Sequence, residues 1–369
     1  MKALRNSIRI LLGLVFIFSG FVKGVDPMGT AYKIEDYLIV YGAQWAEPLA
    51  LTFSVILCAF EFALGIYLVL NLKPRLTSVL TLLLMVYFTL VTFFDALYNL
   101  VPDCGCFGDA LKLTNWQTFY KNIVLIAFAL FVFLCRKKFN TPYSKNVSLI
   151  MLALIPLFFV WFEIYNIRHL PAIDFTSWKA GNHMVPGKLK PVNYYLVYEN
   201  KETKEVKEFV SSTLPFSDSV WMSKWQYKDT RIEDPNTYLA PNFRILDTAS
   251  NDLTNSFMRN PEYVLFLVCV QAEATKTEPL KEFAAFFTKA KQLGYTVIGL
   301  TSTPPDKTAI WKKEQKLDVD FYETDDTELK AMVRANPGLV LIKNGVVIKK
   351  WHYNDFPSFD DFKIKYPIN

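Results

Sequence analysis

The stretch Leu76–Ala110 reads LTSVLTLLLMVYFTLVTFFDALYNLVPDCGCFGDA. Its first part, Leu76–Val101, is long and apolar enough to cross a bilayer, which takes about 20 residues of helix. Cys104 and Cys106 follow directly, one residue apart, among glycine, proline and aspartate residues. The stretch therefore predicts a membrane-spanning helix that ends in a tight loop carrying two thiols.

Four other segments share this apolar character, so we expect five spanning helices. The five segments are Ile8–Val25, Pro48–Leu72, Leu76–Val101, Trp116–Cys135 and Val147–Ile167. The first lacks the small-residue cleavage site of a secretory signal, so it is predicted to remain as a helix. Between the first two, Ile34, Leu38, Tyr41 and Trp45 recur at helical spacing. They favour a short amphipathic helix on the outer leaflet over an ordered loop.

The charged residues near these segments predict the orientation of the chain. Alternate connections are basic and hold no acid: Lys2, Arg5, Arg9, Lys73, Arg75, Arg136, Lys137, Lys138 and Lys145. The other connections hold the acids Asp26, Glu35, Asp36, Glu47, Asp103 and Asp109. Because cytoplasmic loops are rich in Lys and Arg, we expect a cytoplasmic N-terminus. The two loop thiols and everything after the fifth helix should then lie outside the cytoplasm.

The membrane half resembles a known family. RILLGLVFIFSGFVKGVDPMG (9–29), EFALGIYLVL (61–70) and DCGCFGD (103–109) are similar to the DoxX/MauE family of bacterial membrane proteins over residues 1–139. The resemblance implies a four-helix membrane bundle, to which residues 140–170 add a fifth spanning helix. It also implies a role in disulfide formation or maturation of exported proteins. Together with the charge pattern, it leads us to expect the bacterial inner membrane and a periplasmic C-terminal part.

Cys104 and Cys106 are the candidate catalytic residues. Thiols outside the cytoplasm tend to be oxidised, and Gly105 and Gly108 permit the tight fold that brings the two cysteines within bridging distance. A strained, exposed disulfide is typical of labile or catalytic pairs. A permanent structural bridge and a metal site are the alternatives, although two thiolates without histidine bind metal poorly, so no metal is expected. Three further cysteines, Cys58, Cys135 and Cys269, are interpreted as small hydrophobic residues.

Glu61 and Asp95 are interpreted as the acids within the membrane. Such groups are costly in lipid and normally face the bundle interior with a partner. Lys23, near the outer end of the first helix, is the predicted partner of Asp95, whereas Glu61 has no evident cation. The two acids either form a proton- or quinone-linked site beside the thiols or make structural contacts between helices. A quinone is the only cofactor that the sequence suggests.

The second half of the chain has a different composition. Residues 1–170 carry 14 of the 40 Lys and Arg and 9 of the 35 Asp and Glu, so the remainder is electrically neutral. This balance argues against a nucleic-acid partner. Residues 171–238 read as a linker and a β-hairpin. Residues 239–369 alternate strands with helices, which predicts an α/β domain ending in a hairpin that turns at Asn344 and Gly345.

This last domain resembles the thioredoxin fold, in its TlpA-like and peroxiredoxin-like group. APNFRILD (240–247) is similar to the opening motif of that group, and ANPGLVLIKNGVVIKKW (335–351) to its terminal hairpin. Pro337 takes the place of the cis-proline of the family. The CxxC motif should follow YVLFLVCV (263–270), yet the chain continues QAEATKTE. Dithiol exchange needs a thiolate there, so this domain is interpreted as a binding module.

Two functional hypotheses follow. In the first, the chain is a membrane thiol–disulfide protein in which Cys104 and Cys106 exchange with exported or envelope proteins while the outer domain holds them. In the second, it is a non-catalytic scaffold or accessory subunit of an export or maturation complex, and the two cysteines only brace a loop. The exposed thiol pair favours the first hypothesis, and the missing CxxC favours the second.

Overall fold

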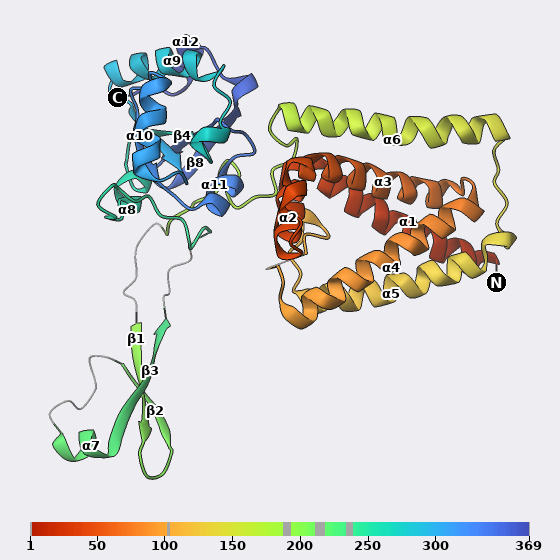
Figure 1. The fold of residues 1–369 in the computed structure, drawn as a ribbon, viewed down its shortest axis with the longest axis horizontal. Coiled ribbons are helices and arrows are strands. Elements are labelled where there is room, and N and C mark those ends of the chain that lie inside the picture. The colour runs from red at the N-terminus through yellow and green to blue at the C-terminus, as the bar shows by residue number, and fades with distance from the viewer. Residues whose placement is uncertain (1, 102–103, 187–192, 211–217, 234–238, 369) are drawn as a thin grey trace.

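The computed structural model describes residues 2–101, 104–186, 193–210, 218–233 and 239–368. Pro102 and Asp103 of the thiol loop therefore lie outside the described residues. The chain forms a helical bundle, a slender three-stranded arm and an α/β domain that sits against one end of the bundle (Figure 1).

Among the described residues, the bundle contains five helices long and apolar enough to cross a membrane, as the sequence predicts, so the protein is a multi-pass membrane protein. The bundle helices are α1 (Lys2–Val25), α2 (Pro27–Val40), α3 (Ala50–Leu70), α4 (Pro74–Tyr98), α5 (Asn115–Leu134) and α6 (Lys145–Arg168). Small residues let α1 and α3 approach closely. A Cβ atom placed on Gly20 would lie 2.6 Å from the backbone nitrogen of Phe62.

Helix α2 lies across the end of the bundle that faces the α/β domain (Figure 1). Asp26 caps it by accepting a hydrogen bond from the backbone N–H of Gly29 at 2.8 Å, and Pro27 occupies its first position. The hydroxyl of Ser54 on α3 donates to the carbonyl of Pro27 at 2.7 Å. A short helix is therefore present here and is fastened to the bundle, but it begins and ends earlier than expected: Tyr41 follows its last residue, and Trp45 lies in the separate 3-10 helix Gln44–Leu49.

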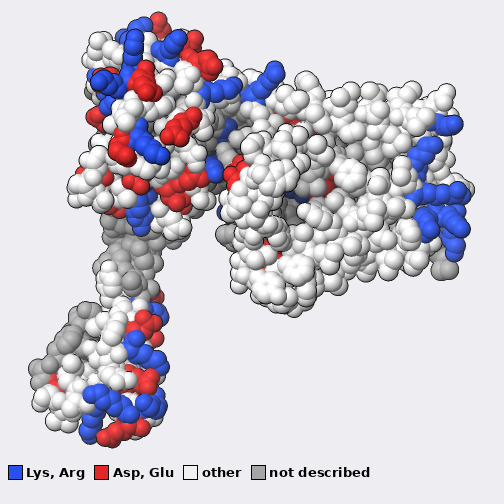
Figure 2. All heavy atoms as spheres, in the orientation of Figure 1, with Lys and Arg blue, Asp and Glu red and all other residues white. Residues whose placement is uncertain are grey.

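Charge is distributed unevenly over the bundle. Figure 2 shows a broad uncharged belt and, at the end that carries the N-terminus, a cluster of Lys and Arg. The α/β domain lies at the opposite end and carries both signs of charge. The thiol loop and this domain thus share one end of the bundle, as helix counting predicts.

The α/β domain has a five-stranded sheet in the order β6-β5-β4-β7-β8. Strands β4, β5 and β6 run parallel, and β7 is antiparallel to both β4 and β8. The elements are α8 (Thr254–Met258), β4 (Tyr263–Val268), α9 (Leu280–Gln292), β5 (Thr296–Thr301), α10 (Pro305–Glu314), β6 (Asp320–Glu323), α11 (Asp326–Met332), β7 (Gly338–Lys343), β8 (Val346–His352) and α12 (Phe359–Lys365). The Asn336–Pro337 peptide bond is cis, and the β7–β8 hairpin turns at Asn344 and Gly345, both at positive φ. These features fit a thioredoxin-like domain.

The structure differs from the sequence prediction at the edge of this sheet. Residues 240–247 begin the stretch predicted to alternate strands with helices, but they form no strand of the sheet, and Leu246 makes only isolated bridges to Asp252 and Glu323. The short strand β6 takes the edge position instead. β6 has only four residues, and its apolar and polar residues do not alternate, so the sequence gave little signal for a strand. The edge of the sheet is formed by the segment that pairs with β5, which is β6.

The three-stranded arm and the segment that follows α6 complete the fold. The expected hairpin, β1 (Asn193–Asn200) with β2 (Val206–Val210), is joined by β3 (Trp225–Glu233) in the order β2-β1-β3, with the short helix α7 (Ser219–Lys224) before β3. Within the predicted linker, Trp178 is fully buried and its ring meets that of Phe243 at 4.8 Å. The segment after α6 is therefore a packed strap of the α/β domain.

Candidate functional site

The two loop thiols lie side by side at the end of α4. The Sγ atoms of Cys104 and Cys106 are 3.1 Å apart, and both cysteines are free. Gly105 and Gly108 adopt positive φ, and the N–H of Gly108 donates to the carbonyl of Gly105 at 2.9 Å. The turn that the glycines were expected to permit is therefore formed, and it places the sulfur atoms within reach of each other.

The loop is held against the bundle by polar and aromatic contacts. The side-chain amide of Asn115 donates to the carbonyl of Val101 at 3.0 Å. The hydroxyl of Ser19 on α1 donates to the carbonyl of Cys106 at 2.8 Å. The buried ring of Phe107 receives the Lys121 ammonium at 4.4 Å. Sequence reasoning expected an exposed pair, but these contacts leave both cysteines partly buried.

The environment of the two thiols is unequal. A hydrogen bond from Cys106 lowers the pKa of Cys104, because it stabilises the thiolate. The same contact, together with burial, raises the pKa of Cys106. Cys104 is therefore the more acidic thiol of the pair, and Cys106 the less acidic one.

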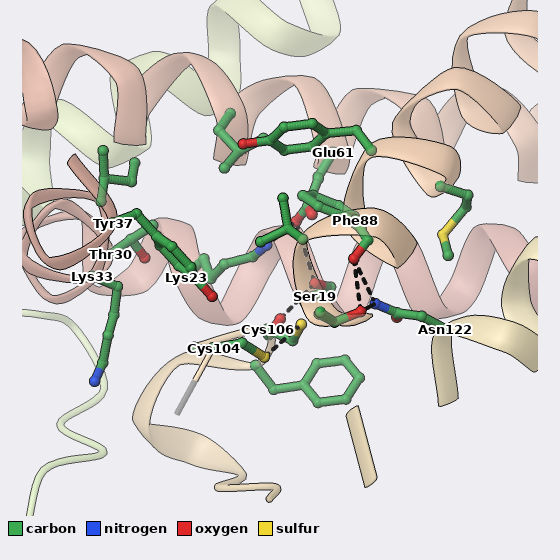
Figure 3. A pocket seen from close by; sticks show the side chains of 18 of the residues that line it. Ser19, Lys23, Thr30, Lys33, Tyr37, Glu61, Phe88, Cys104, Cys106 and Asn122 are labelled. Atoms are coloured by element: carbon green, nitrogen blue, oxygen red, sulfur yellow. Dashed lines mark hydrogen bonds and ion pairs between the residues drawn. The ribbon is translucent and has the colours of Figure 1, made fainter. Parts of the chain in front are cut away.

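A cavity of about 460 Å³ lies directly behind the loop, between α1, α2, α3, α4 and α5 (Figure 3). Its wall is mainly apolar and includes Phe16, Leu57, Met85, Phe88, Val91 and Leu125. Both loop cysteines also line it, as do Lys23, Glu61 and Tyr37. The cavity thus joins the thiol pair to the interior of the membrane bundle.

Lys23 pairs with Glu61, which corrects the expected pairing with Asp95. Its Nζ lies 2.5 Å from Oε2 of Glu61, and both side chains are almost fully buried. Asp95 instead accepts a hydrogen bond from the hydroxyl of Tyr37 at 2.6 Å. The physical reason is helix packing: α1 lies against α3, and α2 reaches the C-terminal end of α4, which spacing along the chain cannot show.

A third acid lies within the membrane and was missed by sequence reasoning. Glu163, on α6, is fully buried, and among the described residues neither of its carboxylate oxygens has a hydrogen-bond partner. Its place inside the fifth apolar segment was the signal that could have revealed it. It does not line the cavity described above.

The α/β domain offers no second thiol pair. Cys269, the last cysteine of the chain, is fully buried just beyond the end of β4, and burial raises the pKa of its thiol. The following segment is tied down, because the side-chain carbonyl of Asn336 accepts from the N–H of Val270 at 3.1 Å and from the hydroxyl of Thr275 at 2.9 Å. Next to them, Pro337 begins the turn into β7.

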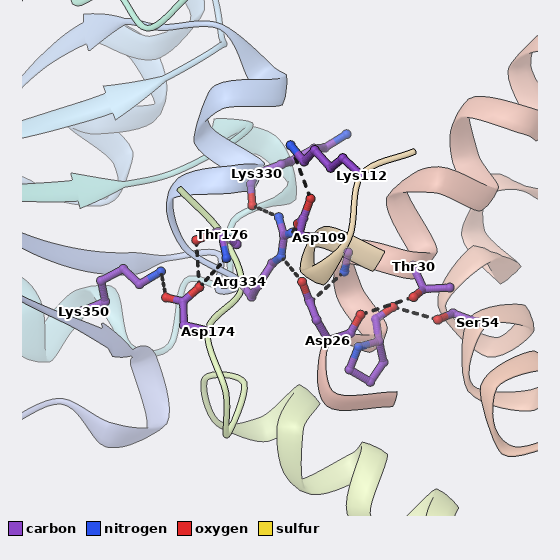
Figure 4. A network of polar contacts seen from close by, with 12 residues as sticks. Asp26, Thr30, Ser54, Asp109, Lys112, Asp174, Thr176, Lys330, Arg334 and Lys350 are labelled. Carbon is purple, nitrogen blue, oxygen red and sulfur yellow. Dashed lines mark hydrogen bonds and ion pairs between the residues drawn. The ribbon is translucent and has the colours of Figure 1, made fainter. Parts of the chain in front are cut away.

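The α/β domain meets the bundle beside the thiol loop. Arg334, in the loop before the cis-proline, has a side chain only 7% exposed. Its guanidinium donates to Asp26 and to Asp109, each at 2.8 Å, as Figure 4 shows. Lys330 adds a weaker ion pair with Glu35 at 3.5 Å. Asp109 lies three residues after Cys106, so the same loop carries the thiols and the docking contact.

Comparison with known proteins agrees with the membrane part. Residues 1–135 match the family model described as methylamine utilisation protein MauE. Protein TlpB of Flavobacterium psychrophilum is 32% identical over 139 residues, which are 36% of this chain and 37% of that protein. The chain thus spans little more than a third of the length of this relative. The MauE match includes helices α1 to α5 and the thiol loop, and it does not extend to the α/β domain.

Proposed function

We propose that this protein carries out thiol–disulfide exchange with exported proteins through Cys104 and Cys106. The observation that carries the proposal is the pair itself: two sulfur atoms 3.1 Å apart, unequal in acidity, at the end of a spanning helix. The basic end of the bundle supports a cytoplasmic N-terminus in the bacterial inner membrane. The thiols and the α/β domain then face the periplasm.

The exchange proceeds from the oxidised pair. A client thiolate attacks the Cys104–Cys106 disulfide at Cys104, and Cys106 leaves and takes up a proton. A second client thiolate then attacks the client sulfur of the mixed disulfide, and Cys104 leaves. The client gains a disulfide, and the pair gains two electrons. The lowered pKa of Cys104 favours this last step, because a more acidic thiol leaves faster.

The α/β domain serves as the client-holding module in this proposal. It lacks a thiol pair of its own, and Arg334 fixes it beside the loop that carries Cys106. A docked domain raises the effective concentration of a held client at the loop, which is the advantage of linking two binding modules.

Trapping tests the proposal. In cells that express Cys106→Ser, Cys104 cannot form the bridge to Cys106, but its thiolate can attack a disulfide of a periplasmic client, from which one client thiolate leaves. The resulting mixed disulfide should accumulate, visible on non-reducing gels and identified by mass spectrometry. Cys104→Ser should give no such adduct, and Cys135→Ser, at the other end of the bundle, should behave like the unaltered chain. A Cys104→Ser chain that still supports oxidation of the same clients would refute the proposal and leave the scaffold hypothesis.

Alkylation of the purified, reduced protein tests the inequality of the thiols. Cys104 should react with iodoacetamide already below pH 8, and Cys106 only at higher pH, as measured peptide by peptide. Equal reactivity of the two at every pH would remove the basis for assigning their roles.

A further inference from the structure

We propose that the cavity behind the thiol loop binds a quinone, a membrane-soluble two-electron acceptor that reoxidises Cys104 and Cys106. The inference rests on the proposed function, because exchange with clients leaves the pair reduced and an oxidant must restore the disulfide. The electrons then leave through the bundle, and the client remains on the side of the α/β domain.

Size and lining suit this ligand class. The cavity of about 460 Å³ lies within the range of small-molecule sites, and aromatic and aliphatic side chains from several helices form most of its wall. Three lining residues, Tyr41, Phe53 and Tyr87, are also 53%, 40% and 58% exposed on the surface of the bundle. Because that surface faces lipid, a ring in the cavity can extend an isoprenoid tail into the bilayer between α2, α3 and α4.

The polar groups of the cavity match a quinone better than an acyl chain. Lys23 has three N–H donors, and Glu61 takes one of them at 2.5 Å. The Nζ atom of Lys23 lies 5.5 Å from the centre of the Phe88 ring, which lines the same cavity (Figure 3). A buried ion pair is costly in a membrane and serves no purpose for a hydrocarbon ligand. A quinone oxygen accepts hydrogen bonds and becomes negative on reduction, which a neighbouring ammonium stabilises.

The redox step balances with these groups. The Cys104 thiolate and the Cys106 thiol join in an S–S bond and release two electrons and one proton. The quinone takes the two electrons, this proton and one further proton from water, and it leaves as the quinol. Ser19 connects the two centres, since its hydroxyl lies 2.8 Å from the carbonyl of Cys106 and 3.2 Å from Glu61.

Binding is tested apart from the redox function. The full chain carrying Cys104→Ser and Cys106→Ser, reconstituted in lipid nanodiscs, is titrated with decylubiquinone and with menadione by calorimetry. We expect at least one of them to bind. Val91→Trp, which fills the cavity, should weaken that binding at least tenfold. Leu90→Trp, the adjacent and 55% exposed position of α4, is the matched control and should change it less than twofold. Binding of neither quinone, or equal binding in both tryptophan variants, overturns the inference.

Electron transfer is tested anaerobically on the reduced chain with native cysteines. Addition of the quinone that binds in the calorimetry should form the Cys104–Cys106 disulfide and one equivalent of quinol. The disulfide is identified by mass mapping, and the quinol is measured by ultraviolet absorbance. The neutral pair Lys23→Met with Glu61→Gln should slow this oxidation at least tenfold while the helical content, checked by circular dichroism, is retained. Oxidation at an unchanged rate in this variant or in Val91→Trp overturns the assignment of the cavity.

The two proposals fail separately. Trapped client adducts without quinone binding refute the quinone site and leave thiol exchange intact. Quinone-driven oxidation without any client adduct refutes exchange with exported proteins and supports the quinone site.

Discussion

Replacement of Arg334 by methionine is the perturbation for which the structure gives the clearest expectation. Methionine keeps a similar length and removes the charge that lies 2.8 Å from both Asp26 and Asp109. Asp26 would then lose its cation in a partly buried site, and Asp109 would keep only the exposed ammonium of Lys112 at 3.7 Å. We expect the α/β domain to loosen from the bundle while each part stays folded, because each has its own hydrophobic core.

The magnitude follows from the burial of the three groups. Removing one partner of a fully buried ion pair costs about 3–5 kcal/mol. The side chains of Asp26 and Asp109 are 14% and 27% exposed, so water relieves part of this cost, and the lower end, about 3 kcal/mol, applies. At about 1.4 kcal/mol per factor of ten, the docking equilibrium should shift roughly 100-fold. Arg334→Lys keeps the charge without the forked geometry and should cost about half as much.

Hydrogen exchange with mass spectrometry measures this effect. Amides near Asp26 and Asp109 should lose protection in Arg334→Met, whereas amides of β4 in the centre of the sheet should keep it. Arg244→Met is the matched control, since Arg244 forms an exposed ion pair with Asp252 at 3.4 Å, which should contribute less than about 1 kcal/mol. Unchanged protection in Arg334→Met, or the same loss in both variants, would refute the reasoning.

Three further predictions follow from packing and burial. Gly20→Ala should lower the thermal unfolding temperature of the bundle, because its Cβ would lie 2.6 Å from the backbone of Phe62; an unchanged temperature contradicts the close approach. Burial lowers the pKa of His352 to about 4, below its unfolded value of about 6.5. The stabilising contribution of the neutral side chain is therefore complete near pH 7 and is lost as pH falls from 6.5 to 4. The free energy of unfolding of the α/β domain in urea should therefore depend less on pH in this range in His352→Gln. Leu341→Ala, at a fully buried position of β7, should reduce the free energy of unfolding by about 2–5 kcal/mol, whereas Ile364→Ala, 80% exposed, should change it by less than about 0.5 kcal/mol in the same urea titration.

The spanning helices and most of the sheet could be predicted because their signals are local. Long apolar runs report the five spanning helices, since about 20 apolar residues are needed wherever a helix crosses lipid. The Asn344–Gly345 pair reports the β7–β8 turn, because both residues accept positive φ. The closeness of Cys104 and Cys106 was predictable for the same reason: one glycine separates them, so no distant segment is needed to bring them together.

Interactions between distant segments could not be predicted. Arg334 lies 308 residues from Asp26 and 225 from Asp109, and no pattern in the sequence joins them. Lys23 was predicted to pair with Asp95 because both were expected near the outer ends of their helices. The rotation of α1 against α3 instead directs the Lys23 ammonium to the carboxylate of Glu61.

The sequence by itself determined the class of the protein, its spanning segments and the location of its thiol pair, because hydrophobic length and turn chemistry are properties of contiguous residues. Only the tertiary structure decided that the thiols border a cavity with a buried ion pair and lie beneath a docked α/β domain. Those features depend on which helix faces lie together. Apolar residues that recur about every 3.6 positions show that a helix has an apolar face, but they do not show which other helix packs against that face.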